Sequence, residues 1–311
     1  MRQTAVTLLD EDGACEFCVD EAYGGGKSAP MDAEAKLLMA CIPGLQAAYG
    51  GAEAAAIKGN VTLNITNGTF DRVFGGNNLS GTIDGSITVN IEEISCRPII
   101  IGELYGGGNQ AGYSVYGYDS DGKPIEPGDD TSLTPLYDDP QVNVKSFTSI
   151  GKVFGGGYGS GATMVGNPTV SVNEVYGKYY NDDKSIVPEN KETPNHYPIP
   201  SHVKGKMGAI SEVFGGGNAA KVMGNTTVNI ATLPEVYIVK QVTAGEALPE
   251  GCYTRSNDGT YSEASGTASA DVTYYEKKAV LGVDIRGNVY GGGNNAEVTG
   301  NTNVNIGKKY W

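Results

Sequence analysis

Gly224-Asn225-Thr226-Thr227-Val228-Asn229-Ile230 is the stretch that decides the fold, because closely related segments recur along the chain. Within it apolar and polar residues alternate, which is typical of a β-strand with one buried face. A glycine run, Val213-Phe214-Gly215-Gly216-Gly217-Asn218, precedes it, and related runs precede most of the other copies. The chain is therefore built from imperfect copies of one unit, which contains a glycine-rich segment and a strand.

The recurring strand predicts columns of like residues. One such strand cannot bury its apolar face alone, whereas copies stacked in register about 4.8 Å apart form a continuous core. The apolar residues predicted to face that core are Leu63, Val89, Val142, Val170, Val228 and Val304. The opposite face is predicted to carry a ladder of amides that bond along the stack, formed by Asn64, Asn90, Asn143, Asn229 and Asn305.

An aromatic residue stands directly before the glycine runs and predicts a column of stacked rings. The ladder residues of this kind are Phe74, Tyr105, Phe154, Phe214 and Tyr290. The earliest aromatic residues are spaced by roughly 25 residues, which is a typical length for one structural repeat. The sequence thus predicts an all-β chain, a parallel β-helix (β-solenoid) of about six or seven coils with glycines at its corners.

Later copies of the unit are lengthened, which predicts a core of coils with insertions. We expect N-terminal coils with an inserted helix in the first part of the chain and the β-solenoid in the rest. The corresponding ranges are 1–48 and 49–311, with insertions at 113–140, 174–208 and 233–280.

Two local patterns add detail to this organisation. A short helix is predicted from Asp32 to Ala40, because Asp32 is a helix-start signal and an asparagine strand is missing there. Residues 235–242 and 271–278 alternate like strands, and Asn257-Asp258-Gly259 between them is a hairpin signal. The last insertion is therefore predicted to be a small β-subdomain.

The charge and hydropathy of the chain exclude some classes of partner. The net charge is −14 and basic residues form no cluster, whereas phosphate recognition needs a face rich in Lys and Arg. No stretch approaches the roughly 20 apolar residues of a membrane span, and residues 1–10 lack the apolar core of a signal peptide. We expect no nucleic-acid partner, no membrane span in this fragment and no signal peptide of its own.

The repeats resemble those of large surface proteins of gut Bacteroidales. The resemblance rests on Gly-Gly-Gly-Asn at 215–218 and on Gly300-Asn301-Thr302-Asn303-Val304-Asn305-Ile306, and the insertion around Gly251-Cys252-Tyr253-Thr254 is similar in character. It covers nearly the whole chain after about residue 15. It implies an extracellular, adhesin-like β-solenoid at the cell surface, and it carries over no catalytic residue.

Three short motifs suggest cofactors, and each departs from its pattern. Gly24-Gly25-Gly26-Lys27-Ser28 has Glu21 where a phosphate-binding loop needs glycine. Cys15-x-x-Cys18 with Cys41 supplies part of a zinc site, with a disulfide or buried thiols as the alternative. Asp119-Ser120-Asp121-Gly122 begins like a calcium loop, but its glycine is fourth rather than sixth. No cofactor or metal is expected, and calcium at the last motif stays an alternative.

The insertions are rich in tyrosine, a residue favoured both at binding surfaces and in β-structure. The candidate partner-binding residues are Tyr113, Tyr116, Tyr118, Tyr179, Tyr180, Tyr197, Tyr253, Tyr261 and Tyr274.

The function expected from these patterns is that of a non-enzymatic cell-surface or secreted scaffold, or adhesin. It would display its tyrosine-rich insertions to a glycan or protein partner. One alternative is a carbohydrate-active parallel β-helix enzyme, which would need clustered carboxylates. The other is a structural filament segment, whose unpaired end strands would associate end to end.

Overall fold

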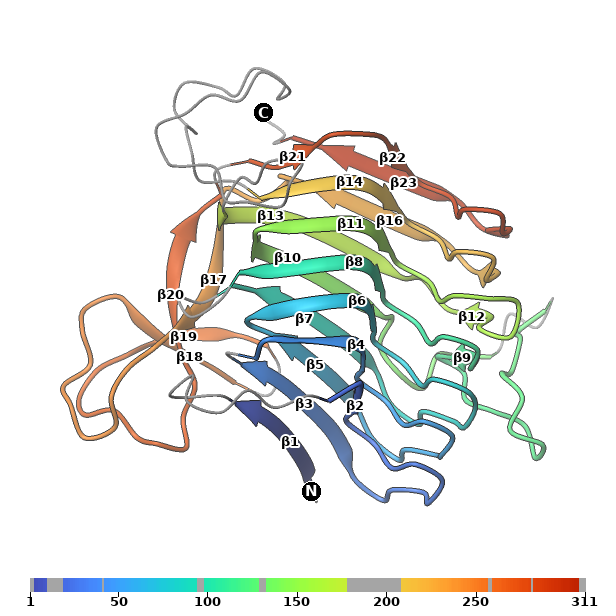
Figure 1. Cartoon of the computed structure of the whole chain (residues 1–311), viewed down its shortest axis with the longest axis horizontal. Helices are drawn as coiled ribbons and strands as arrows, with labels where there is room; N and C mark the ends of the chain where they lie inside the picture. Colours follow the sequence, from blue (N-terminus) through green and yellow to red (C-terminus); the bar gives the residue numbers. More distant parts are fainter. Residues whose placement is uncertain are drawn as a thin grey trace.

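The computed structural model describes residues 3–9, 19–40, 42–93, 98–128, 133–177, 208–256, 259–280 and 282–307. Within these ranges the chain is all-β and contains no helix. Most strands belong to two large parallel sheets, in which successive strands are added in the order of the sequence (Figure 1). A short parallel sheet and an antiparallel sheet complete the structure.

In the described part of the chain, sheet A consists of two strands without asparagine followed by the copies of the repeated strand. The parallel register brings like residues together, so that Val170 lies opposite Val228 and Asn229 lies opposite Asn305. In spatial order the strands are β1 (Gln3–Leu9), β3 (Glu34–Ala40), β5 (Val61–Ile65), β7 (Ile87–Glu92), β10 (Gln141–Phe147), β13 (Thr169–Gly177), β16 (Thr226–Ile230) and β23 (Thr302–Ile306).

Sheet B is formed by the segments that lead into the glycine runs. Its neighbouring strands are also parallel, and the last two short strands both pair with β14. The strands are β2 (Glu21–Tyr23), β4 (Gly44–Tyr49), β6 (Gly68–Phe74), β8 (Ile99–Tyr105), β11 (Ser149–Phe154), β14 (Ala209–Phe214), β21 (Asp284–Ile285) and β22 (Val289–Tyr290).

Two smaller sheets lie beside these. The short parallel sheet consists of β9 (Tyr113–Ser114), β12 (Met164–Val165) and β15 (Val222–Met223). The antiparallel sheet, called sheet D below, consists of β17 (Glu235–Lys240), β20 (Tyr274–Ala279), β18 (Cys252–Arg255) and β19 (Tyr261–Ala264), in that spatial order.

The main core lies between sheets A and B. Leu63 and Val89 of sheet A are fully buried in one cluster with Val73 and Leu104 of sheet B. The apolar column predicted from the sequence is confirmed by the strand register and by its burial. Val304 departs from it and is 40% exposed, because among the described residues no strand pairs with the outer side of β23.

The aromatic residues form the predicted column on sheet B. From Tyr23 to Tyr290 the rings are nearly parallel, with centroids 4.7–5.0 Å apart. The glycine after each ring allows this spacing, since a Cβ on Gly155 would overlap the carbonyl oxygen of Gly215 in the next layer. These glycines are therefore required by the close approach of successive backbones.

The prediction of a single β-solenoid with a short N-terminal helix is wrong. The strands are distributed over two large parallel sheets, a short parallel sheet and an antiparallel sheet, and they do not resolve into one solenoid. The sequence pattern shows which residues repeat, but it does not show how the segments between the repeated strands pair.

The segment predicted as a helix is strand β3. Its burial alternates along the strand, with Leu37 and Met39 fully buried. These two residues lie opposite Leu63 and Ile65 of β5, and β1 pairs with the other side of the strand. The helix propensity of Glu, Ala, Leu, Lys and Met is overridden because only an extended segment can pair with both neighbours.

Glu174, near the end of β13, is a fully buried carboxylate. Its Oε1 accepts a hydrogen bond from the backbone N–H of Gly208, whereas Oε2 has no partner. Burial raises the pKa of Glu174 well above its ordinary value of 4.5, and Asp284 and Glu93 raise it further. Because the unfolded chain ionises at lower pH, this group destabilises the fold as the pH rises above about 4.5.

The register of sheet A can be tested with two adjacent substitutions. Val228→Asp puts an unpaired charge into the core and is expected to lower the free energy of unfolding by about 4 kcal/mol. Thr227→Asp, on the outward face, is expected to cost about 1 kcal/mol or less. Urea denaturation measures both, and equal losses would contradict the register.

Glu174→Gln removes the buried acid and keeps an acceptor for Gly208. We expect the stability of the wild-type protein relative to this variant to fall as the pH rises from about 4.5 to 8, because the unfolded wild-type chain ionises Glu174 there while the folded chain keeps it protonated. Chemical denaturation of both proteins across this range gives the difference. A difference that does not change with pH would show that Glu174 is not a buried acid.

Candidate functional site

The outward face of sheet A carries the predicted asparagine ladder. The Nδ2 of Asn90 donates to the Oδ1 of Asn64 at 2.9 Å, and the Nδ2 of Asn143 donates to the Oδ1 of Asn90 at 3.1 Å. Ser171 takes the next position, and the ladder resumes where Asn305 donates to Asn229 at 2.9 Å. The side chains of Asn64, Asn90 and Asn143 are half-buried, so they remain accessible from one side.

Sheet D presents a face of tyrosines. The rings of Tyr237 and Tyr261 are stacked, with centroids 3.9 Å apart. Tyr253 meets Tyr237 edge-on at 5.0 Å, and Tyr275 meets Tyr261 edge-on at 5.1 Å. The guanidinium of Arg255 lies over the Tyr261 ring, 5.8 Å from its centroid.

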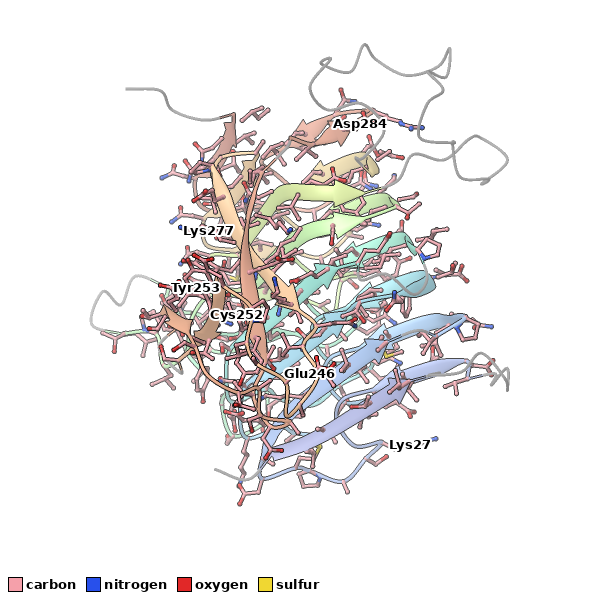
Figure 2. The ribbon with its side chains drawn as sticks, turned by 90° about the vertical axis from the view of Figure 1, so that its left-hand side faces the viewer. Lys27, Glu246, Cys252, Tyr253, Lys277 and Asp284 are labelled. Atoms are coloured by element: carbon pink, nitrogen blue, oxygen red, sulfur yellow. The ribbon has the colours of Figure 1, made fainter. Side chains whose placement is uncertain are left out.

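A groove of about 470 Å³ separates the ladder from the tyrosine face. Asn64, Asn90 and Asn143 line one side of it, and Tyr237, Tyr261 and Tyr275 line the other. Strands β17 and β20 run along the stack, across the direction of the sheet A strands (Figures 1 and 2). The groove therefore follows the ladder from strand to strand, and we call it the ladder groove.

An ion pair within sheet A holds sheet D through hydrogen bonds to the backbone of β17. Lys145 Nζ lies 3.3 Å from Glu92 Oε2 and donates to the carbonyl oxygen of Tyr237 at 2.7 Å. Glu92 Oε1 accepts the backbone N–H of Val239. Because both charged side chains are largely buried, they have little water to replace a lost partner, and the pair fixes sheet D in place.

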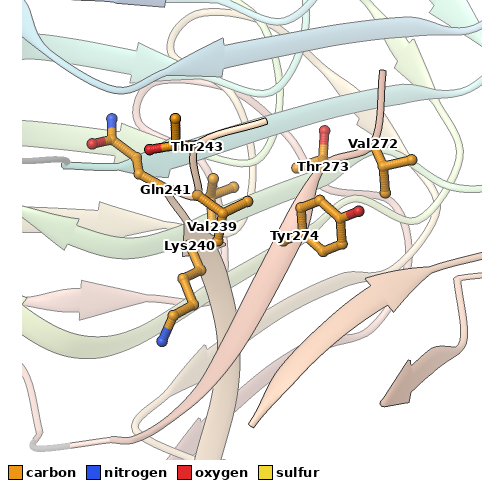
Figure 3. Close-up of a pocket in the computed structure, with 8 residues that line it drawn as sticks. Val239, Lys240, Gln241, Thr243, Val272, Thr273 and Tyr274 are labelled. Carbon is orange, nitrogen blue, oxygen red and sulfur yellow. The ribbon is translucent and has the colours of Figure 1, made fainter. Parts of the chain in front are cut away.

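A second pocket, of about 490 Å³, lies where β17 ends and β20 begins (Figure 3). It is lined by Lys240, Thr243, Val272 and Tyr274, among others. The ammonium of Lys240 is paired with Glu276 at 3.1 Å. This pocket belongs to sheet D and its loops alone and has a single aromatic lining residue, so the ladder groove is the better candidate for a binding site.

The candidate tyrosines of the 113–140 insertion pack against the body of the structure. Tyr113 is buried and its hydroxyl donates to the carbonyl oxygen of Gly85 at 2.9 Å. The Tyr118 hydroxyl accepts the N–H of Ile83 at 3.1 Å, and Tyr116 packs against the same core cluster as Tyr113. Burial raises the pKa of both Tyr113 and Tyr118 far above the ordinary tyrosine value.

The other candidate tyrosines divide between two faces of sheet D. Tyr253 and Tyr261 lie in the tyrosine face, half-buried. Tyr274 is buried on the opposite face, where its hydroxyl accepts the N–H of Ser269 at 3.1 Å. The remaining candidates, Tyr179, Tyr180 and Tyr197, lie outside the described residues.

Several residues of the groove are not among the candidates predicted from the sequence: Tyr237, Tyr275, Arg255, Glu92 and Lys145. The alternation of β20 places Tyr274 and Tyr275 on opposite faces, and only the pairing of Tyr275 with Tyr253 shows which face joins the groove. Burial raises the pKa of Tyr275 and Tyr261, whereas the nearby charge of Arg255 lowers both.

The sequence motifs that suggest cofactors have structural roles wherever their residues belong to the described part of the structure. Asp119 Oδ1 accepts the N–H groups of Asp121 and Lys123, both at 2.9 Å, as in an Asx turn. Lys27 pairs with Glu53 at 3.8 Å. Cys15, Cys18 and Cys41 lie outside the described residues. Among the described residues, no group of three or more His, Cys, Asp or Glu side chains is placed to hold a metal ion.

Comparison of the chain with protein-family models, curated proteins and solved structures found no match. In the part of the chain that the structure describes, no helix has the length and apolar character needed to cross a membrane.

The joint between sheets D and A can be tested with Lys145→Met, which leaves Glu92 buried without its cation. We expect a local loss of about 3 kcal/mol, seen as roughly 100-fold faster amide hydrogen exchange in β17 with little change in β5. Lys152→Met is the control, since Lys152 pairs with Glu212 at 3.2 Å on a more exposed surface. Equal protection of β17 in both variants would contradict the joint.

Proposed function

We propose that the protein is a non-enzymatic scaffold, or adhesin, at the cell surface or secreted, that binds a glycan in the ladder groove. One observation carries the proposal: the groove places a row of amides opposite a cluster of tyrosine rings. Its volume of about 470 Å³ falls within the usual range for ligand pockets.

The two sides of the groove match the two kinds of surface on a sugar. Asparagine amides both donate and accept hydrogen bonds, as sugar hydroxyls do. Tyrosine rings offer flat apolar area with a polar tip at low entropic cost, and the apolar C–H face of a sugar ring can pack on them. The combination supports a glycan over a purely apolar ligand.

The carboxylates of the groove favour binding over hydrolysis. Glu92 is paired with Lys145, and Glu235 is paired with Lys277 at 3.3 Å. Both are therefore held as salt-bridge partners, whereas a glycosidase uses two carboxyl groups facing each other across the bond it breaks. The alternative, a carbohydrate-active enzyme, is distinguished by release of reducing ends from a bound polysaccharide, which we do not expect.

The proposed location at the cell surface is supported by the sequence alone. The repeats at 215–218 and 300–306 resemble those of surface proteins of gut Bacteroidales, and the acidic composition suits a solvated surface. The scaffold role is supported by the stacked sheets, which hold sheet D through the buried pair of Glu92 and Lys145.

A glycan array followed by titration tests the function. Tyr261→Ala is expected to weaken binding of any glycan detected at least tenfold, as for an aromatic residue at the centre of an interface. Tyr290→Ala removes a half-exposed ring at the end of sheet B, outside the groove, and should change affinity less than twofold. Equal effects of the two variants, or no glycan bound at all, would contradict the proposal.

A second candidate function, a structural filament segment, is favoured by the ends of sheet A. Ile306 in β23 is 69% exposed, and Val6 in β1 at the other end is 37% exposed. Stacking β23 of one copy beside β1 of another in the same parallel sense would continue the columns, with Val304 against Val6 and Tyr290 against Tyr23. We propose a second copy of the chain as the occupant of this end.

Sedimentation velocity over a range of concentrations tests the end-to-end contact. We expect larger species to grow with concentration, and Ile306→Asp to abolish them. Leu79→Asp is the control, because Leu79 is also exposed but lies outside the strands. A protein that stays monomeric at all concentrations would contradict the filament role and leave glycan binding untouched.

A further inference from the structure

The ladder groove is periodic along the stack, which restricts the shape of its ligand. Asn64, Asn90 and Asn143 come from three successive strands of sheet A, and Ser171 comes from the fourth. At the usual spacing between strands the four positions cover about 14 Å. Sheet D extends in the same direction, since β17 and β20 run up the stack (Figure 1). Both walls therefore favour an elongated ligand over a compact one.

Each ladder amide keeps part of its hydrogen-bonding capacity. Asn90 donates once to Asn64 and accepts once from Asn143. A side-chain amide has two N–H groups and two acceptor lone pairs, so one of each remains after the ladder bonds are made. The same donor and acceptor recur on each asparagine strand, as hydroxyl groups recur along a polysaccharide.

The carboxylates of the groove are each neutralised by a lysine, and Arg255 is the one further charge among the groups named here. Glu92 and Glu235 each pair with a lysine, Lys145 and Lys277, and Arg255 lies over the Tyr261 ring. The chain as a whole carries −14 charges, which repel a polyanion. These features favour an uncharged ligand.

A peptide ligand is less well matched. Extended peptides bind by adding a strand to a free sheet edge, through backbone hydrogen bonds. The ladder groove instead lies on the face of sheet A, where strands β5, β7 and β10 are already paired on both sides. It offers side-chain amides and rings, which suit hydroxyl groups and sugar rings.

We propose that the ladder groove binds a neutral, linear polysaccharide that lies parallel to the stacking direction, with hydroxyl groups of successive sugar units paired to Asn64, Asn90 and Asn143. This inference rests on the proposed glycan-binding function and specifies its ligand. The sugar rings pack on Tyr237 and Tyr261. The bound segment is about three or four sugar units long, one for each sheet A strand that lines the groove.

The ladder also supplies its own control. Asn229 and Asn305 belong to the same column and make the same hydrogen bond, but neither lines the groove. If the ladder is purely structural, substitutions at Asn90 and at Asn229 should change the affinity for the oligosaccharide equally. If the ladder binds the ligand, only substitutions at the positions under sheet D should weaken binding.

The experiment is calorimetric titration with β-1,4-linked gluco- and manno-oligosaccharides of one to six units, and with polygalacturonate as a charged polymer. We expect affinity for at least one neutral series to rise at least tenfold from one unit to four and then to level off. Polygalacturonate should bind at least tenfold more weakly per site. The measurements use the full chain.

Two variants inside the groove and one outside complete the test. Asn90→Ala should weaken binding of the four-unit oligosaccharide at least tenfold, and Asn229→Ala should leave it within twofold. Asn143→Ser should weaken it as well, and the fold already accommodates serine in this column at Ser171. Melting temperatures of all three variants show whether the stack is intact.

The outcomes separate this inference from the proposed function. A single sugar that binds as tightly as the four-unit oligosaccharide would overturn the linear ligand and leave glycan binding standing. Preference for polygalacturonate, or for an extended peptide used as a comparison, would overturn the neutral polysaccharide. Equal losses in Asn90→Ala and Asn229→Ala would show that the ladder is structural only, and binding of no oligosaccharide or glycan would reject both proposals.

Discussion

In sheet A, Val170 pairs in parallel with Val142 on one side and with Val228 on the other, and this register positions the other features of the structure. A shift of one residue would turn the valines outward and the asparagines into the core. The asparagines follow the valines directly, so the amide ladder forms on the outer face wherever the valines pack on the inner one. The rings of sheet B repeat at the same spacing, because the glycine that follows each ring lets the backbones of successive layers approach closely.

The candidate site arises where the regular stack meets an irregular insertion. The repeat supplies a floor of evenly spaced amides, and sheet D supplies the rings that face it. Neither part alone supplies both the amides and the aromatic rings. Their joint is made by hydrogen bonds to the β17 backbone at Tyr237 and Val239 from a buried ion pair of sheet A, Glu92 and Lys145. Moving sheet D away would leave the two buried charges without these backbone partners in a place with little water to replace them, which suits a wall that must keep its distance from the floor.

Part of this architecture follows from local sequence. Alternation in segments such as Val61–Ile65 identified the strands, the inward column and the amide ladder, because a period of two leaves one choice of buried face. The helix predicted from Asp32 to Ala40 rests on a local start signal and on the missing asparagine, whereas the strand formed there is fixed by β1 and β5, which are distant in sequence. The single solenoid was wrong for a related reason, since repeat spacing does not reveal how the connecting segments pair.

The site was harder to predict than the strands. Tyr113 and Tyr253 look alike in sequence, yet one is buried against Gly85 and the other lies in the tyrosine face. Tyr274 and Tyr275 are neighbours that point to opposite faces, so composition alone could not choose between them. Glu92 lies 53 residues from Lys145 and 147 from Val239, so no local pattern links these three residues.

The most direct test of the account is to observe the side-chain amide signals of the ladder by NMR during titration with a linear neutral oligosaccharide of four units. The account predicts that the signals of Asn64, Asn90 and Asn143 shift with a common affinity, while those of Asn229 and Asn305 stay in place. These two groups share one column and one hydrogen-bonding pattern, and they differ in whether they line the groove. Shifts that are equal along the whole ladder, or confined to Asn229 and Asn305, would contradict it.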